Sequence, residues 1–193
     1  MNVVQIGCND CKDHVFSFVN ENANEIKNLV LVDALPKCIE EAKKQYLFLG
    51  ERATAINAAI GVKNGLIDFF YPTQDEQSEH ASLNFRHLVE HNHELITKKT
   101  MICLDIDEFV EGLPFREIDY FFLDVEGMDV EVLLKMDIEK YSPKFIRFEY
   151  CHSDGPFFVG KNFIKIVRKP KHLNYQLRLD GDRDMIAQKE QKV

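Results

Sequence analysis

Carboxylate and amide side chains follow several apolar runs of the 193-residue sequence. The first three runs end in Gly7-Cys8-Asn9-Asp10, in Asp33 and in Asn57-Ala58-Ala59. Two later runs end in Asp124-Val125-Glu126 and in Glu149, which His152 follows closely. A carboxylate accepts hydrogen bonds from the hydroxyls of a ribose, and a carboxylate or an imidazole can take a proton from a reacting group. These residues are therefore candidates for a site that binds a nucleoside and performs acid–base chemistry.

The elements that would position these residues alternate along the chain. Apolar runs typical of strands cover residues 2–6, 29–36, 53–61, 65–72, 118–125 and 144–151, and apolar residues at helical spacing cover residues 12–27, 36–49 and 129–141. The region between the fourth run and residue 100 is polar. This alternation predicts an α/β fold with a doubly wound, mainly parallel sheet. The length and the 45% of hydrophobic residues suit one core, so we expect a single domain over residues 1–193.

The loop after the first strand indicates the kind of ligand. In open sheets of this type, ligands bind beyond the carboxyl ends of the strands, where the connections diverge. Gly7 allows a sharp turn and a close approach of the backbone, and Asn9 tolerates a left-handed conformation. A dinucleotide site needs further glycines around a pyrophosphate, and Asp10 would repel phosphate. The acidic loop favours S-adenosylmethionine, which has a cationic sulfonium and a cationic ammonium group.

Four motifs resemble those of the FkbM-type methyltransferases, a branch of the class I S-adenosylmethionine-dependent fold. Residues 5–11 are similar to the family's D-I-G-A-N-x-G, residues 32–36 to F-E-P-x-P, and residues 57–61 to N-x-A-x-G. The most specific motif, D-V-E-G, is intact at residues 124–127. Ser82 and the pair Leu104-Asp105 also fit, and residues 173–188 look like the family's final antiparallel hairpin. Gln5, Cys11 and Ala34 depart from the pattern, where the family has an acid, a glycine and a proline.

The resemblance implies an enzyme that uses S-adenosylmethionine as methyl donor. The expected donor-binding residues are Gln5, Gly7, Cys8, Asn9, Asp10, Asp33, Ala34, Asn57, Ala58, Ala59 and Asp124, and the candidate catalytic residues are Asp124, Glu126, Glu149 and His152. Methyl transfer from a sulfonium needs orientation and, for a hydroxyl acceptor on a sugar or another small molecule, a base. The carboxylates and the imidazole would also suit a divalent cation such as Mg²⁺, although we assign no residue as a metal ligand.

The polar stretch at residues 77–99 carries histidines at helical spacing. His87 and His91 would share one helix face with Glu90 and Glu94 nearby, which is a possible metal site. Such residues on a polar helix are more commonly a solvated surface, so we expect a lid or a substrate loop instead.

Residues in and after the run at 144–151 have two possible interpretations each. Phe157, Phe158 and Lys161 could form a second wall of the substrate site, although packing in the core would explain the aromatic residues equally well. Glu149 and His152 are candidate active-site residues, but they could also be a strand-end pair exposed to water.

Charge and cysteine content limit the partners and the compartment. The net charge of −8 makes nucleic acid and anionic membranes poor partners. The apolar stretches are too short for a membrane helix, and the first residues lack the order of a signal peptide, so we expect a cytoplasmic protein. The five cysteines are expected to be reduced thiols, since the Cys8-x-x-Cys11 pair lacks the second pair of a zinc site.

Two other functions remain open, and the sequence does not indicate an oligomeric state. An oxidoreductase that uses NAD would share Asp33 but would need the glycines that the first loop lacks. A relative without catalytic activity, which binds S-adenosylmethionine or a partner protein, would be compatible with Gln5 and Cys11.

Overall fold

Two sheets organise the computed structural model, which describes residues 1–75, 78, 80–155 and 158–190. In this part of the chain, the main sheet has seven strands in the order β3-β2-β1-β7-β8-β10-β9, and the small sheet has three in the order β4-β6-β5. The strands are β1 (Asn2–Ile6), β2 (Asn28–Asp33), β3 (Ala53–Asn57), β4 (Ala59–Gly61), β5 (Gly65–Pro72), β6 (Ile96–Asp105), β7 (Tyr120–Leu123), β8 (Phe145–Glu149), β9 (Tyr175–Asp180) and β10 (Asp184–Lys189). The helices are α1 (His14–Glu21), α2 (Pro36–Gln45), α3 (Phe85–Glu90), α4 (Ile106–Glu111), α5 (Asp129–Lys135), α6 (Ile138–Tyr141) and α7 (Lys161–His172), with a 3₁₀ segment η1 (Leu47–Arg52).

The main sheet confirms the doubly wound, mainly parallel architecture. β1 pairs in parallel with β2 and β7, β2 pairs in parallel with β3, and β7 pairs in parallel with β8. The chain moves outward from β1 to β3 and then returns to β7 on the other side of β1, so its connections diverge between β1 and β7. β10 is antiparallel to β8 and β9, which confirms the C-terminal hairpin.

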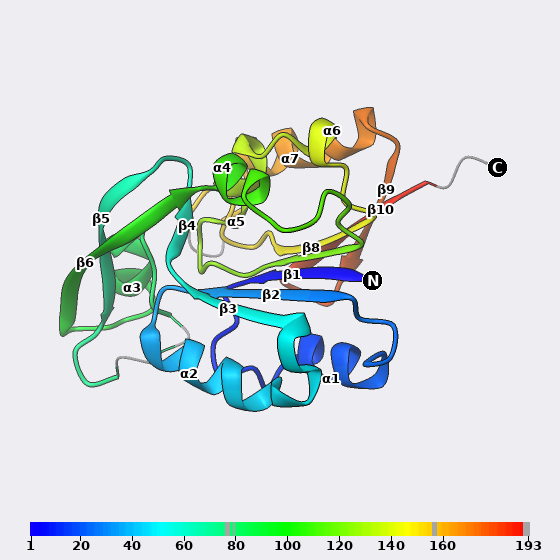
Figure 1. Cartoon of the computed structure of the whole chain (residues 1–193). Coiled ribbons are helices and arrows are strands. Elements are labelled where there is room, and N and C mark those ends of the chain that lie inside the picture. Colours follow the sequence, from blue (N-terminus) through cyan, green and yellow to red (C-terminus); the bar gives the residue numbers. More distant parts are fainter. Residues whose placement is uncertain (76–77, 79, 156–157, 191–193) are drawn as a thin grey trace.

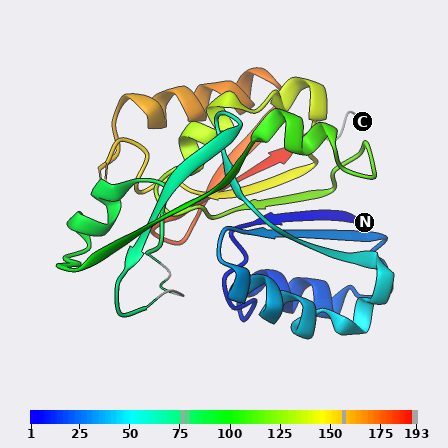
Figure 2. The same cartoon turned by 60° about the vertical axis from the view of Figure 1, so that its left-hand side comes forward.

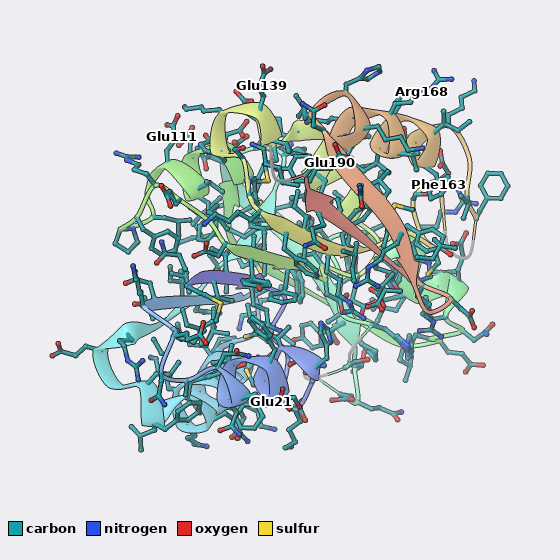
Figure 3. All side chains as sticks on the ribbon, turned by 90° about the vertical axis from the view of Figure 1, so that its right-hand side faces the viewer. Glu21, Glu111, Glu139, Phe163, Arg168 and Glu190 are labelled. Carbon is teal, nitrogen blue, oxygen red and sulfur yellow. The ribbon has the colours of Figure 1, made fainter. Side chains whose placement is uncertain are left out.

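Helices cover both faces of the main sheet. α1 and α2 lie on one face, and α4 to α7 lie on the other (Figure 1). Alternate side chains of β1 explain this arrangement, because Val3 packs in the buried cluster with α1 and α2, whereas Val4 packs in the cluster with α4, α5 and α7. Figure 3 shows Glu21 of α1 on the opposite side of the molecule from Glu111 and Glu139. Strands that are buried on both faces read as continuous apolar runs, as the sequence predicted.

The predicted strand at residues 53–61 is divided between the two sheets. β3 pairs with β2 in the main sheet, β4 pairs with β6 in the small sheet, and Ala58 separates β3 from β4. β5 and β6 form a long antiparallel pair that projects with α3 from one end of the main sheet (Figures 1 and 2). The strand predicted at residues 65–72 is therefore confirmed, but it belongs to the small sheet.

All three predicted helices are shorter than the sequence pattern suggested. The helix expected at residues 36–49 ends at Gln45, and the 3₁₀ segment η1 follows it from Leu47. The helix expected at residues 12–27 is confined to His14–Glu21, with Asp13 as its N-cap and Asn22 as its C-cap. Asparagine competes for backbone hydrogen bonds and favours such helix ends. The helix expected at residues 129–141 is broken at Met136, whose φ and ψ of −51° and 131° are not helical.

Two elements were not predicted. β6 starts at Ile96, inside the region expected to be polar, and its Lys98 and Lys99 side chains are exposed. α7 buries Ile166 and Pro170, four residues apart on one helix face. Among the described residues, none of the helices has the length and apolar character needed to cross a bilayer.

Candidate active site

A cleft lies at the carboxyl ends of β1 and β7, where the chain connections diverge. Its cavity volume is about 220 Å³. The predicted donor-binding residues that line it are Gly7, Cys8, Asn9, Asp10, Asp33, Ala34, Ala58, Ala59 and Asp124. Phe69 and Leu83 also line the cleft, and both lie in the small-sheet segment, which is the part of the chain between β4 and Asp105 (residues 62–104). The cleft thus joins residues of the first three motifs to the start of the fourth.

The first turn depends on a close approach of two backbone segments. Gly7 has a φ of 78°, and a side-chain carbon at this position would lie 1.6 Å from the carbonyl oxygen of Asp124. Asn9 and Cys11 are also left-handed, with φ of 42° and 54°. These values confirm the predicted turn. Cys11 adopts, at the family's last glycine position, a conformation that glycine adopts most easily.

Asp33 connects the loops that follow β1 and β2. Its Oδ2 accepts a hydrogen bond from the backbone N–H of Asn9 at 2.9 Å, and its Oδ1 accepts one from Leu35 at 2.8 Å. Burial raises the pKa of this carboxyl, and the backbone hydrogen bonds oppose the increase. Each carboxylate oxygen has a second lone pair. Asp33 can therefore accept ribose hydroxyls while it holds both loops.

Gln5 and Asn57 lie outside the residues that line the cleft. Gln5 is 3% exposed, and its Nε2 donates to Oδ2 of Asp13 at 2.6 Å. Asp13 caps α1 and lines the cleft, and its place in the site was not predicted from the sequence. Asn57 donates from Nδ2 to the carbonyl oxygens of Asp33 and Ala34, each at 3.0 Å. Gln5 and Asn57 therefore stabilise the segments that form the cleft, although neither residue lines it.

The thiols beside the cleft are buried. Cys8 and Cys11 pack in the apolar cluster of α1 and α2, and Cys38 lies on α2. A hydrogen bond with Cys11 and burial raise the pKa of Cys8, and burial raises the pKa of Cys38 to about 12. Such thiols stay protonated, and protonated thiols are poor metal ligands. The geometry supports the expectation of reduced thiols.

Residues 124–127 form a tight turn directly after β7. Glu126 and Gly127 have left-handed φ values of 50° and 83°. Oγ of Ser82 donates to the carbonyl oxygen of Glu126 at 2.6 Å, which ties the turn to the small-sheet segment. Asp129 Oδ2 accepts from the backbone N–H of Val125 at 3.3 Å. Hydrogen bonds with Ser82 and Asp129 therefore both stabilise this turn.

Three carboxylates converge at this turn. Oxygens of Asp124, Glu126 and Glu149 all lie within 4.8 Å of one another. Asp124 and Glu126 would point to opposite faces of a regular strand, but β7 ends at Leu123, and the turn lets them meet. The structure thus brings together three of the four predicted catalytic residues.

The fourth predicted catalytic residue, His152, is buried beside Glu149. The alternative prediction, that these two residues form a pair exposed to water, is therefore wrong. Their side chains are 4% and 10% exposed, and Nε2 of His152 lies 3.7 Å from Oε2 of Glu149. Burial and the charge of Asp124 raise the pKa of Glu149 to about 7. Burial and the neighbouring His91 lower the pKa of His152 to about 4. At neutral pH the imidazole is therefore uncharged, and Glu149 is close to its midpoint of ionisation.

His87 is a further residue of the site, and the prediction that it lies on a solvated surface is wrong. It is 0% exposed, and its Nε2 lies 3.2 Å from Oε2 of Glu126. Burial lowers its pKa to about 3, so the neutral ring can donate its Nε2 proton to the Glu126 carboxylate. The segment that carries α3 therefore supplies both a wall of the donor cleft and a partner for Glu126.

The second wall of the substrate site stays a prediction. Phe158 is 61% exposed, so core packing does not explain it, and Lys161 begins α7 at the surface. Phe157 lies outside the described residues. Neither Phe158 nor Lys161 lines the donor cleft.

The fold and this site define a class I methyltransferase domain, with a donor cleft between the divergent connections and an acidic turn beside it. The FkbM methyltransferase domain family matches residues 5–177, and the chain belongs to that family. No curated protein sequence matches the chain.

Two crystal structures are similar in fold. Methyltransferase FkbM from Methylobacillus flagellatus KT has a TM-score of 0.58 and 10% sequence identity, over 96% of this chain and 43% of that chain. The SAH-bound methyltransferase PaMTH1 from Podospora anserina has a TM-score of 0.54 and 9% identity, over 98% of this chain and 72% of that chain. Both comparisons confirm the predicted fold. The chain spans less than half the length of the Methylobacillus protein.

Proposed function

We propose that the chain transfers a methyl group from S-adenosylmethionine to a hydroxyl of a sugar, a glycoconjugate or another small molecule. The observation that carries this proposal is one cleft lined by both Asp33 and Glu126. A carboxylate suited to ribose hydroxyls and a carboxylate suited to an acceptor proton thus face the same ligand. The family and the SAH bound to PaMTH1 support the donor.

The proposed reaction needs little from the protein beyond orientation and a base. The loops after β1, β2 and β3 would hold the adenosine, and the turn after β7 would face the methyl group. Since the sulfonium is already activated, holding the acceptor oxygen in line with the methyl carbon provides most of the rate. Glu126 would take the hydroxyl proton, with His87 holding its carboxylate in place.

Asp33 provides a direct test of donor binding. A hydrogen bond to a charged carboxylate contributes about 1.5–3 kcal/mol, so we expect Asp33→Asn to weaken SAH binding roughly 10- to 150-fold. Asp33→Ala should weaken it further, because the loop amide groups of Asn9 and Leu35 would lose their acceptor. Calorimetry with SAH measures both, with the exposed Asp182→Asn as the control. An unchanged affinity of Asp33→Asn would remove this carboxylate from the donor site.

A thermal-shift screen separates the other two functions. Stabilisation by SAM and SAH but not by NAD supports the methyl-donor site, and stabilisation by NAD alone supports an oxidoreductase. A protein that binds SAH but methylates no hydroxyl compound in a broad panel would be the binding module.

The raised pKa of Glu149 predicts that the rate of methyl transfer depends on pH. Because its pKa is raised to about 7, the carboxyl is uncharged below that pH, and its ionisation adds a negative charge beside Asp124 and Glu126 that makes the base stronger. The ratio kcat/KM should therefore rise as the pH increases through about 7. In Glu149→Gln this ionisation is absent, so the rise should move to lower pH. An identical profile for both proteins would contradict the assignment.

The same carboxylates offer a second way to activate the acceptor. Oxygens within 4.8 Å of one another are a donor set for a hard divalent cation. If a cation is required, EDTA abolishes activity and Mg²⁺ restores it. If Glu126 acts only as a base, activity in EDTA is unchanged.

We also retain three predictions of the sequence. Residues 1–193 would form a single domain, the protein would act in the cytoplasm, and its substrate would be a small molecule rather than nucleic acid or a membrane. The net charge of −8 supports the last of these.

A further inference from the structure

Helix α7 and its flanking residues concentrate positive charge in an acidic protein. Residues 155–179 contain six of the 24 basic residues and none of the 32 acidic residues, although the whole chain has a net charge of −8. The six are Lys161, Lys165, Arg168, Lys169, Lys171 and Arg178. The expectation that anionic surfaces are poor partners rests on the total charge, and the local charge of this segment has the opposite sign.

The exposed residues of α7 lie on one face of the helix. They recur every three or four positions and cover about a third of its circumference. They are Lys161, Ile164, Lys165, Arg168, Lys171 and His172. The opposite face carries the buried residues Ile166 and Pro170, and Figure 3 shows Arg168 at the outer side of the molecule. Lys161, Lys165, Arg168 and Lys171 therefore form a cationic stripe that faces solvent.

The cationic stripe has no acidic partner within the part of the chain that the structure describes. Lysines of the neighbouring helices differ, because Lys135 pairs with Asp107 at 2.6 Å and Lys140 pairs with Glu111. Lys169, on the inner side of α7, donates to three backbone carbonyl oxygens at the end of α5. The positive charges of the stripe are thus available to an anion outside the protein.

Exposed apolar side chains lie at the start of the same helix. Phe158 is 61% exposed, Val159 41% and Ile164 50%. The backbone beneath them is fixed, because the carboxylate of Asp154 accepts hydrogen bonds from the N–H of Gly160 at 2.7 Å and from the first turn of α7. Their exposure therefore belongs to the fold and is not the fraying of a helix end.

We propose that α7 docks the protein on an anionic lipid bilayer, with the cationic stripe on the headgroups and with Phe158, Val159 and Ile164 inserted beside it. Helices that lie in the membrane interface combine basic and apolar side chains in this way. A nucleic acid would contact the cations but leave the apolar side chains in water, so the surface favours lipid. The bilayer is a docking surface and not the methyl acceptor, so this proposal goes beyond the proposed function and does not depend on it.

Vesicle sedimentation with the full chain tests the docking. Vesicles with about 30% phosphatidylserine in phosphatidylcholine should bind at least about 100-fold more tightly than phosphatidylcholine alone, because each basic residue at an anionic surface contributes roughly fivefold. Salt screens this attraction, so NaCl at about 0.5 M should release the protein. Equal binding to the two kinds of vesicle, or binding to neither, overturns the proposal, whether or not the protein methylates any acceptor.

Variants assign the surface. Lys165→Gln combined with Arg168→Gln should weaken binding to the anionic vesicles roughly 25-fold, and Phe158→Ser should weaken it about tenfold. The control Lys37→Gln with Lys43→Gln removes the same charge from exposed positions of α2, across the sheet, and should bind normally. Circular dichroism and SAH binding verify each fold.

Three results of this comparison would contradict the docking. Unchanged binding of the α7 variants, or an equal loss in the α2 control, removes α7 from the interface. An RNA oligonucleotide that binds more tightly than the anionic vesicles, and that loses affinity in the Lys165→Gln and Arg168→Gln variant, would assign the cationic stripe to nucleic acid instead.

Discussion

Glu126→Gln is expected to lower turnover by about 10²–10⁴-fold, the contribution of a general base, while affinity for SAH changes little. Glutamine keeps the shape of the side chain and removes the proton acceptor. The left-handed turn at Glu126 is held by Ser82 through the main chain, so the substitution should leave the backbone in place. Single-turnover methylation with labelled donor measures the effect, after a panel of sugars and glycoconjugates has been screened for an acceptor.

Glu131→Gln is the matched control, because this glutamate is exposed on α5, close to Glu126 in the chain. It should retain full activity. If Glu126→Gln also retains full activity, Glu126 is neither the base nor a cation ligand. Asp124, Glu149 and His152 are then the residues to substitute next.

Gly7→Ala is expected to lower the free energy of unfolding by about 2–5 kcal/mol, the sum of left-handed strain and overpacking. The new methyl group would collide with the carbonyl oxygen of Asp124, so β1 and β7 would have to separate at the cleft. SAH binding should be lost with that movement. Urea unfolding and calorimetry measure the two effects.

Gly181→Ala separates strain from collision. Gly181 has a similar φ of 73°, but a side-chain carbon there meets nothing within 4 Å. We expect this variant to lose only about 1–2 kcal/mol and to bind SAH normally. If the two variants behave alike, the contact with Asp124 does not shape the donor cleft.

The central strands were predictable because both of their faces are buried. Residues 2–6 and 118–125 read as strands for this reason, and the mainly parallel character of the sheet follows from the alternation of strands with helices. The division at Ala58 was not predictable, because residues 53–61 form one continuous apolar pattern. The partner that takes β4 into the small sheet is β6, and the exposed Lys98 and Lys99 concealed that strand.

The donor half of the site was predictable from position alone. The carboxyl ends of parallel strands meet at one edge, so Gly7, Asp33 and Asp124 could be placed together without a structure. The contact between His87 and Glu126 joins residues 39 apart and depends on how the small-sheet segment folds back. A polar sequence pattern does not report such burial, so His87 was misplaced.

Because the two sheets separate at Ala58, the small-sheet segment can be replaced as a unit while the main sheet is kept. In the described part of the chain, residues 62–104 contribute no strand to the main sheet, so their length can change without breaking its hydrogen bonds. If this segment is the substrate loop that the sequence predicts, grafting it alone between relatives should transfer the acceptor preference. A successful graft would have to keep apolar side chains at Phe69 and Leu83, which line the donor cleft, and the Ser82 hydroxyl that holds the turn at Glu126.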